Sequence, residues 1–388
     1  MKRRVYLDHL AGTPLAPEVR EAMRPFLEKG FVGNPGSLHS RGLGAREALE
    51  KAREQCAQFI HAATEDILFT GSGTEANNLA VKGVAFAQRE RGTHIVLSNI
   101  EHPSIDRSVA WLEENGFTAT RVSVDGEGRV APDDVAEVIT DQTILIATHH
   151  ASHDLGTVQD VEAIGAIAAE RGVPLLIDAT ASGGWLTIDV QASNISLLSL
   201  APHRFSGPQG VGVLYRNRRV PLTPLLHGGV QEDGLRAGIE NIPAIVGAGT
   251  AAALPLPDVA PLQQKLHEGL MECLELIHLN GPKPGAARLP SHLNFSIEHL
   301  EGEGLALALD MQGVAIASGA ACVTQNLAVP SALLAIGLDA ALAKGNVLFS
   351  LGRDTTPDDI AHVLEIVPEQ VAKLRAMSPA WAETKNLK

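Results

Sequence analysis

Two polar side chains follow apolar runs that predict buried strands, and both are of types that act on ligands. Asp178 ends the run PLLIDA (174–179), where its carboxylate could hold a protonated ring nitrogen, a catalytic proton or a metal, or cap the next helix. His102 follows the run HIVLS (94–98), where its ring could stack on a planar ligand or cap the helix after it. Taken alone, each of these side chains could simply cap a helix.

The segment FTGSGTEANN (69–78) joins another predicted strand to a helix that we expect to open at Thr74. A helix start presents free N–H groups and the positive end of the helix dipole, both of which favour anions. Thr74 is also a residue type that caps helices without any ligand, and the motif matches no phosphate-binding fingerprint. Because parallel strands end at one edge of a sheet, this motif, Asp178 and His102 together predict a ligand site.

The loop SLAPHRFSGPQGVG (199–212) has the small residues and the Gly-Pro-x-Gly turn of a cofactor loop, but Arg204 stands where such chemistry would use an amine. A guanidinium stays protonated and does not form the covalent bond to an aldehyde that a lysine amine forms. The sequence has no lysine between Lys82 and Lys265, so no neighbour can replace this amine.

The elements that would position these residues form a long alternating array. Apolar β-branched runs at 66–70, 94–98, 143–149, 174–179, 195–200 and 210–215 predict strands, and helical patterns lie at 74–91, 103–115, 132–139 and 160–171. This order is typical of a doubly wound, largely parallel sheet. Earlier helices are expected from Pro17 and over 43–60.

A proline-rich connection, LPLPDVAPL, marks the end of this array near residue 253. A helix over 260–277, a strand at 292–297 and a final helix over 357–376 follow it. We therefore expect a large α/β domain over 13–253, and a small α+β domain built from 1–12 and 254–388.

Composition and spacing exclude several classes of protein. The net charge of −14 argues against a general nucleic-acid binder, and no apolar run approaches the roughly 20 residues of a membrane span. We expect a cytoplasmic protein with no nucleic-acid or membrane partner. Cys56 and Cys273 lie on apolar helix faces and are expected in the core. The histidines at 149, 150 and 153 have no recognised metal spacing, so no metal is expected.

Ten motifs occur in the order typical of one known family. They are YLDHLAGTPLAPEV, GNPGSLHSRG, GSGTEANNLAVKG, EHPSID, LGTVQDV, LLIDATAS, HRFSGPQGVGVLY, HGGVQEDGLRAGIEN, ASGAAC and FSLGRDTTPDDI. The chain resembles the cysteine desulfurases, in the class V aminotransferase branch of the pyridoxal phosphate (PLP) proteins of fold type I. The resemblance implies a mostly parallel seven-stranded sheet, a small C-terminal domain carrying the Cys322 loop, and a homodimer with the cofactor at the interface.

The resemblance assigns roles to several residues that this sequence keeps. It implies that the His102 ring stacks on the PLP ring and that Asp178 pairs with the ring nitrogen. Thr74 and Gly73 occupy positions at the cofactor phosphate, and His203 lies beside the position of the cofactor lysine. Cys322 matches the cysteine that takes sulfur from the substrate as a persulfide.

Other family positions are changed. Arg204 replaces the lysine, and Leu348 replaces the arginine that grips the substrate carboxylate. The remaining changes are Ser152-His153-Asp154 for Asn-Asn-Glu, Ala181 for glutamine, Ala201 for serine and Ile239 for threonine. These losses predict a pseudoenzyme that is not a competent PLP desulfurase alone, with no covalently bound cofactor and with PLP binding doubtful.

Several functions remain open on the sequence. One is a sulfur relay through a persulfide on Cys322, unless that cysteine is merely a small buried residue. Another is a non-catalytic partner in sulfur or iron–sulfur metabolism, as a homodimer, as a heterodimer with an active desulfurase, or bound to a sulfur-acceptor protein. The alternative is an active cysteine desulfurase or class V aminotransferase-like enzyme that binds PLP non-covalently, or binds another anionic ligand near Arg204.

Overall fold

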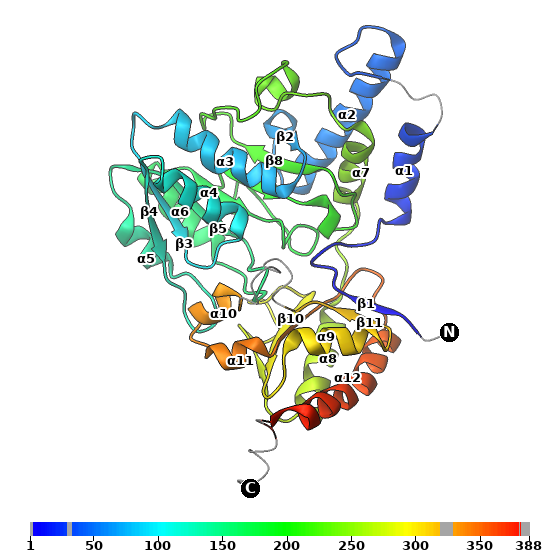
Figure 1. Ribbon diagram of the computed structural model, residues 1–388. Helices are drawn as coiled ribbons and strands as arrows, with labels where there is room; N and C mark the ends of the chain where they lie inside the picture. The colour runs from blue at the N-terminus through cyan, green and yellow to red at the C-terminus, as the bar shows by residue number, and fades with distance from the viewer. Residues whose placement is uncertain (1–2, 29–32, 319–328, 380, 382–388) are drawn as a thin grey trace.

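A seven-stranded sheet forms the centre of the larger part of the molecule. The computed structural model describes residues 3–28, 33–318, 329–379 and 381 (Figure 1). The sheet has the strand order β2-β8-β7-β6-β5-β3-β4. Its strands are β2 (Ile67–Thr70), β3 (His94–Ser98), β4 (Thr118–Val122), β5 (Thr143–His149), β6 (Leu175–Asp178), β7 (Leu197–Leu200) and β8 (Gly212–Arg216). All neighbouring pairs are parallel except those of β8 with β2 and β7, which is the α/β fold that the alternating pattern predicts.

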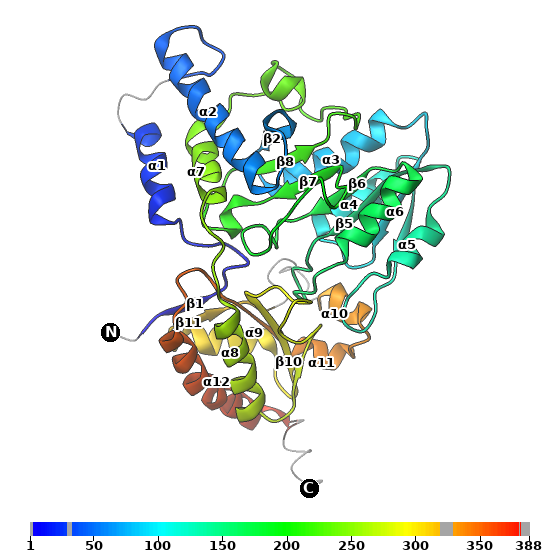
Figure 2. The same cartoon turned by 180° about the vertical axis from the view of Figure 1, so that it is seen from behind.

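Helices cover both faces of this sheet. On one face α3 (Gly73–Ala87) and α4 (Pro103–Glu113) share a buried apolar cluster with β3 and β5 (Figure 1). The other face packs against helices that Figure 2 shows from behind. They are α1 (Pro17–Leu27), α2 (Ser40–Phe59), α5 (Pro132–Val138), α6 (Val161–Arg171) and α7 (Ile242–Ala252). Successive residues of a strand point to opposite faces, so Leu176 joins the first cluster whereas Leu175 and Ile177 join the second.

A smaller unit lies below the large sheet in Figure 1. Its antiparallel sheet has the order β12-β10-β9, and a parallel pair joins β1 to β11, so the N-terminus pairs with a strand more than 300 residues later. Its elements are β1 (Val5–Leu7), α8 (Ala260–Cys273), β9 (Ile277–Leu279), β10 (His292–Ile297), α9 (Gly302–Asp310), β11 (Val314–Ile316), α10 (Ser331–Ala335), α11 (Ala340–Lys344), β12 (Asn346–Ser350) and α12 (Pro357–Met377). The domain limits at 12/13 and 253/254 stay a prediction.

The turn after β5 connects the two units through its main chain. The His153 carbonyl accepts a hydrogen bond from His292 Nε2 (3.0 Å), and the Asp154 carbonyl accepts one from Asn294 Nδ2 (2.7 Å). Gly156 has φ +73° and lies against the His292 ring, where a Cβ atom would come within 2.6 Å of Nδ1. A side chain at Gly156 would therefore push β10 away from the turn.

Several local expectations need correction. The helix expected to open at Thr74 begins at Gly73, and its N-cap is Ser72, whose Oγ accepts from the Glu75 N–H (3.1 Å). Cys273 is exposed because it is the last residue of α8, whereas Cys56 is buried as expected. Burial raises the pKa of the Cys56 thiol to about 12, so it stays protonated at neutral pH. No helix in the described ranges is long and apolar enough to cross a membrane.

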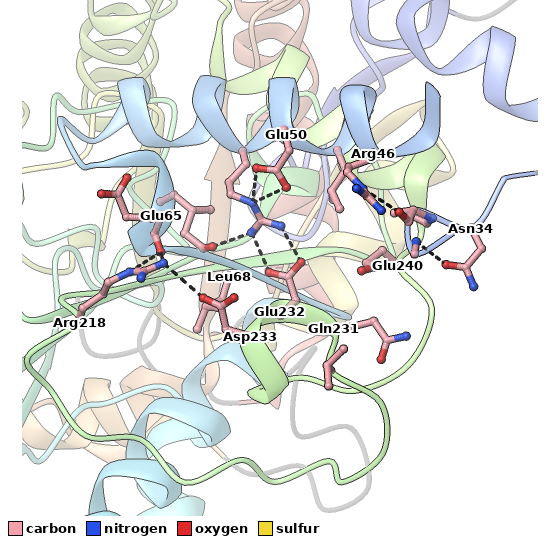
Figure 3. Close-up of a pocket in the computed structure, with 16 residues that line it drawn as sticks. Asn34, Arg46, Glu50, Glu65, Leu68, Arg218, Gln231, Glu232, Asp233 and Glu240 are labelled. Atoms are coloured by element: carbon pink, nitrogen blue, oxygen red, sulfur yellow. Dashed lines mark hydrogen bonds and ion pairs between the residues drawn. The ribbon is translucent and has the colours of Figure 1, made fainter. Parts of the chain in front are cut away.

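A buried ion pair ties α2 to the large sheet in a pocket between α2, β2 and the 3₁₀ turn η3 (Gln231–Gly234) (Figure 3). Arg53 Nη1 and Nη2 each donate to the Glu232 carboxylate at 2.8 Å. Arg53 also donates to the Ile67 carbonyl, and Glu232 accepts from the Phe69 N–H (2.9 Å). These contacts hold Glu232 at φ +49°, a backbone conformation that costs about 1–3 kcal/mol in a residue other than glycine.

Removing one partner of this pair should destabilise the protein strongly. We expect Arg53→Ala to lower the free energy of unfolding by about 3–5 kcal/mol, because Glu232 would keep a buried charge without its partner. The control is Arg24→Ala, which removes the exposed Arg24–Glu21 pair and should cost less than about 1 kcal/mol. Urea unfolding followed by circular dichroism measures both. Equal losses in the two variants would contradict the structural role of Arg53.

Candidate active site

The predicted site residues meet at the carboxyl edge of the large sheet. Asp178 ends β6, and in register it pairs with His149 at the end of β5 and with Ser199 in β7. His102 immediately precedes α4, and Gly73 opens α3. In parallel sheets ligands bind outside this edge, so the strand order brings together residues that lie more than 100 positions apart in the sequence.

Asp178 is a buried carboxylate that remains ionised. Its oxygens accept hydrogen bonds from Asn77 Nδ2 (2.8 Å), the Thr180 N–H (2.9 Å) and Ser199 Oγ (3.3 Å). Burial alone would raise the pKa of this group, but nearby His102 and the bonds from Thr180 and Asn77 hold the pKa below its usual value. Asp178 can therefore hold a cation such as a protonated ring nitrogen.

His102 supplies a neutral ring beside this carboxylate. Its Nδ1 accepts from the Ser104 N–H (3.1 Å) and lies 2.7 Å from Ser104 Oγ, so it caps α4, one of the two roles open to it. Asn77 Nδ2 also donates to Ser104 Oγ (2.9 Å), which links His102 to Asp178 through two side chains. Burial and the nearby His153 lower the pKa of His102 to about 4, so its imidazole is uncharged at neutral pH.

The start of α3 is suited to an anion. The N–H groups of Gly73 and Thr74 lie in the first helical turn, where no intrahelical acceptor exists. A Cβ atom on Gly73 would lie 2.8 Å from Thr180 Cγ2, so only glycine allows this close approach of the helix to the strand ends. Glu75 in the same turn pairs with Arg236 (Nε–Oε1 2.8 Å), which offsets its negative charge.

Arg204 brings a permanent positive charge to the site. It lies in the 3₁₀ turn η2 (Pro202–Arg204), and its Nη1 is 3.5 Å from Thr180 Oγ1. Burial together with the charge of Arg204 lowers the pKa values of His203 and His153 to about 4, so both imidazoles are neutral at pH 7.

Other expected site positions lie elsewhere or outside the described residues. Cys322 falls in the segment 319–328, outside the described residues. Leu348 is a buried residue of β12, whereas Ile239 is 64% exposed. Sequence analysis missed Asn77, which contacts both Asp178 and Ser104. The signal was present, because Asn77 is a polar residue between the core residues Ala76 and Leu79 of an otherwise apolar helix face.

Comparison with known families and curated proteins assigns the chain to a family. The family model for class-V aminotransferases matches residues 5–363. A cysteine desulfurase IscS from Dictyoglomus turgidum is 40% identical, and the alignment covers 99% of both chains. The cysteine desulfurase IscS of Methanosarcina thermophila is 42% identical, with 97% of this chain and 94% of that protein covered.

Solved structures agree with this assignment. A NifS-like protein superposes with a TM-score of 0.89 at 30% sequence identity, covering 96% of this chain and all of that chain. A structure described as SspA in complex with cysteine gives a TM-score of 0.81 at 35% identity, covering 92% of this chain and all of the other. The fold of the chain is therefore that of the NifS-like PLP proteins of fold type I.

These matches contradict the expectation of a pseudoenzyme with a sulfur-relay or non-catalytic role. Full-length relatives at about 40% identity are cysteine desulfurases, which supports an active enzyme. The doubt about the cofactor was also wrong, because the class-V family implies PLP. The physical reason is that the expectation gave most weight to Arg204, although Asp178, His102 and the start of α3 are groups that could hold a cofactor without a covalent bond. The chain belongs to the cysteine desulfurase family of the class-V aminotransferases.

Proposed function

We propose that the protein is a PLP-dependent enzyme that removes sulfur from cysteine, with the cofactor held by non-covalent contacts. The observation that carries this proposal is the buried, ionised Asp178 beside the neutral ring of His102. Relatives named cysteine desulfurases at about 40% identity support the activity, and the 35% identical structure in complex with cysteine supports the substrate.

The residues at the site are of the types that the parts of PLP require. A protonated pyridine nitrogen needs an ionised carboxylate, which Asp178 provides. A planar ring needs a flat, uncharged neighbour, and His102 is one. A phosphate needs N–H donors at close range, and the start of α3 offers those of Gly73 and Thr74. A Cβ atom on residue 73 would not fit there, because it would contact Thr180.

The residues of this chain have separable tasks in the reaction. PLP, when bound, supplies an electron sink for bonds to the substrate α-carbon. Asp178 would hold the protonated ring nitrogen through its ionised carboxylate. Arg204 cannot bond covalently to an aldehyde, so its contribution is a fixed positive charge beside Thr180. Since Leu348 replaces the family arginine, we propose that Arg204 instead attracts the substrate carboxylate.

Two further parts of the proposal extend beyond the described site. We propose a homodimer, because Val230 (88% exposed) and Ile239 (64% exposed) leave apolar side chains uncovered on a loop of the large unit. The resemblance makes Cys322 the sulfur acceptor, and a reducing cytoplasm would keep that thiol free. A sulfur-acceptor protein would then receive the persulfide sulfur.

Restoring the amine should make PLP attachment covalent. We expect Arg204→Lys, treated with PLP and borohydride, to gain the mass of one pyridoxyl group, whereas the native protein releases PLP on dialysis and gains none. Intact-mass spectrometry measures both. Arg89→Lys, an exposed position at the end of α3, is the control and should behave like the native protein. An adduct on the native protein would show that another lysine reaches the site and would overturn non-covalent binding.

Neutralising Asp178 should weaken PLP binding. We expect Asp178→Asn to raise the dissociation constant of PLP by about 10- to 100-fold, as loss of a charge-assisted hydrogen bond implies. Asn keeps the shape and can still accept from the Thr180 N–H, so the fold should survive. Fluorescence titration with PLP gives the constant, with the exposed Asp141→Asn as control. Unchanged affinity would remove the main support for the proposed function.

A further inference from the structure

We propose that His153, paired with Asp154, accepts the proton from the α-carbon of the bound amino acid. This inference rests on the proposed function and adds a base to it, since the sequence has no lysine between Lys82 and Lys265. The family position of His153 is an asparagine, which cannot accept a proton in this way.

The position of His153 is the first support. Its ring packs edge-to-face against the ring of His102, with centroids 4.9 Å apart and an interplanar angle of 72°. His102 is the residue proposed to stack on the cofactor, so the His153 ring would lie beside the bound cofactor. Its side chain is 17% exposed, which leaves it partly accessible.

The backbone of His153 is held on both sides. Its carbonyl accepts from the buried His292 of β10, and the carbonyl of Asp154 accepts from Asn294 of the same strand. Ser152 Oγ accepts from the Leu155 N–H (3.2 Å) within the turn. A base must be held in place to take a proton efficiently, and this turn is fixed by hydrogen bonds from both units.

The pair places an uncharged imidazole beside a carboxylate. Asp154 Oδ2 lies 3.4 Å from His153 Nε2, within ion-pair distance, so a proton taken up by the His153 ring would face a carboxylate. Burial and Arg204 lower the pKa of His153 to about 4, so the imidazole is neutral at pH 7. The charged and titratable groups that face it are His102, His149, Glu101, Asp154, Asp178, Arg204 and His292.

Proton transfer from the substrate α-carbon to His153 needs no further reactant. The substrate Cα–H bond breaks, its electron pair stays on the substrate carbon and is drawn toward the cofactor, and a new N–H bond forms on His153. The imidazole gains one positive charge, which the Asp154 carboxylate favours and the charge of Arg204 opposes. The same proton is then available for return to the substrate.

Neighbouring histidines are less suited to the task. His102 uses Nδ1 to cap α4 through Ser104. His149 is engaged on both nitrogens, with Glu101 Oε1 (3.0 Å) and Gln159 Nε2 (3.0 Å), and only 5% of its side chain is exposed. Among the described residues no carboxylate lies within ion-pair distance of His203, whereas His153 has Asp154.

The test follows proton exchange with L-alanine, which has no sulfur and so does not depend on Cys322. Proton NMR in D₂O follows the loss of the α-proton signal of L-alanine in the presence of the purified, PLP-loaded native protein. We expect His153→Asn to slow this exchange by at least about 100-fold, the usual contribution of a general base. Asp154→Asn should slow the exchange less. Added imidazole should partly restore exchange in His153→Ala, and a purely structural role of His153 would not allow this rescue.

A matched control and a readout other than turnover complete the test. His278→Asn removes a histidine–carboxylate pair, with Glu298 at 2.8 Å, at the exposed middle residue of β9, and this variant should exchange the α-proton like the native protein. In protein with ¹⁵N-labelled histidine, PLP alone should shift the His153 ring signal, identified by its loss in His153→Asn.

Three results would overturn the inference. His153→Asn exchanging as fast as the native protein at equal PLP occupancy would overturn it alone and leave the proposed function intact. A His153 signal unmoved by bound PLP would do the same. If the native protein neither binds PLP nor exchanges alanine faster than free PLP does, the proposed function and this inference fail together.

Discussion

The buried charge of Asp178 constrains how the rest of the site is built. An ionised carboxylate is costly to bury unless donors surround it, and here the donors come from α3, from the residue after β6 and from β7. These three elements must therefore keep a fixed register. The same Asn77 that serves Asp178 also reaches Ser104, and Ser104 holds His102. One network thus fixes His102, Asp178 and the start of α3 relative to one another.

The fold was largely predictable because its signals are local. Buried parallel strands are continuous apolar runs, and β3, β5 and β10 begin and end at the predicted residues, 94–98, 143–149 and 292–297. The helix α7 was missed because its sequence, IPAIVGAGTAA, is apolar on all sides and shows no periodic face. The short strands β1, β9 and β11 depend on partners far away in the sequence, so local pattern alone cannot delimit them.

The site was predictable as a set of positions but not as a set of interactions. Strand ends pointed to Asp178 and His102, the expected helix start pointed to Thr74, and the family resemblance added Gly73. The pattern could not show that Ser72 takes the capping role, because Ser, Thr and Gly all suit helix starts. It marked Asn77 as a polar residue on an apolar helix face but could not show that its partners are Asp178 and Ser104. The inference about activity failed for a related reason: a changed side chain is visible in a sequence, whereas the intact network around it is not.

The contact between the turn after β5 and strand β10 has a consequence for how this site could change over time. His292 and Asn294 bond the carbonyl oxygens of residues 153 and 154, and every amino acid carries a carbonyl oxygen. The two units therefore dock in a way that does not depend on which side chains stand at these positions. Substitutions at positions 153 and 154 can therefore change the side chains at the site while the main-chain contacts between the two units remain.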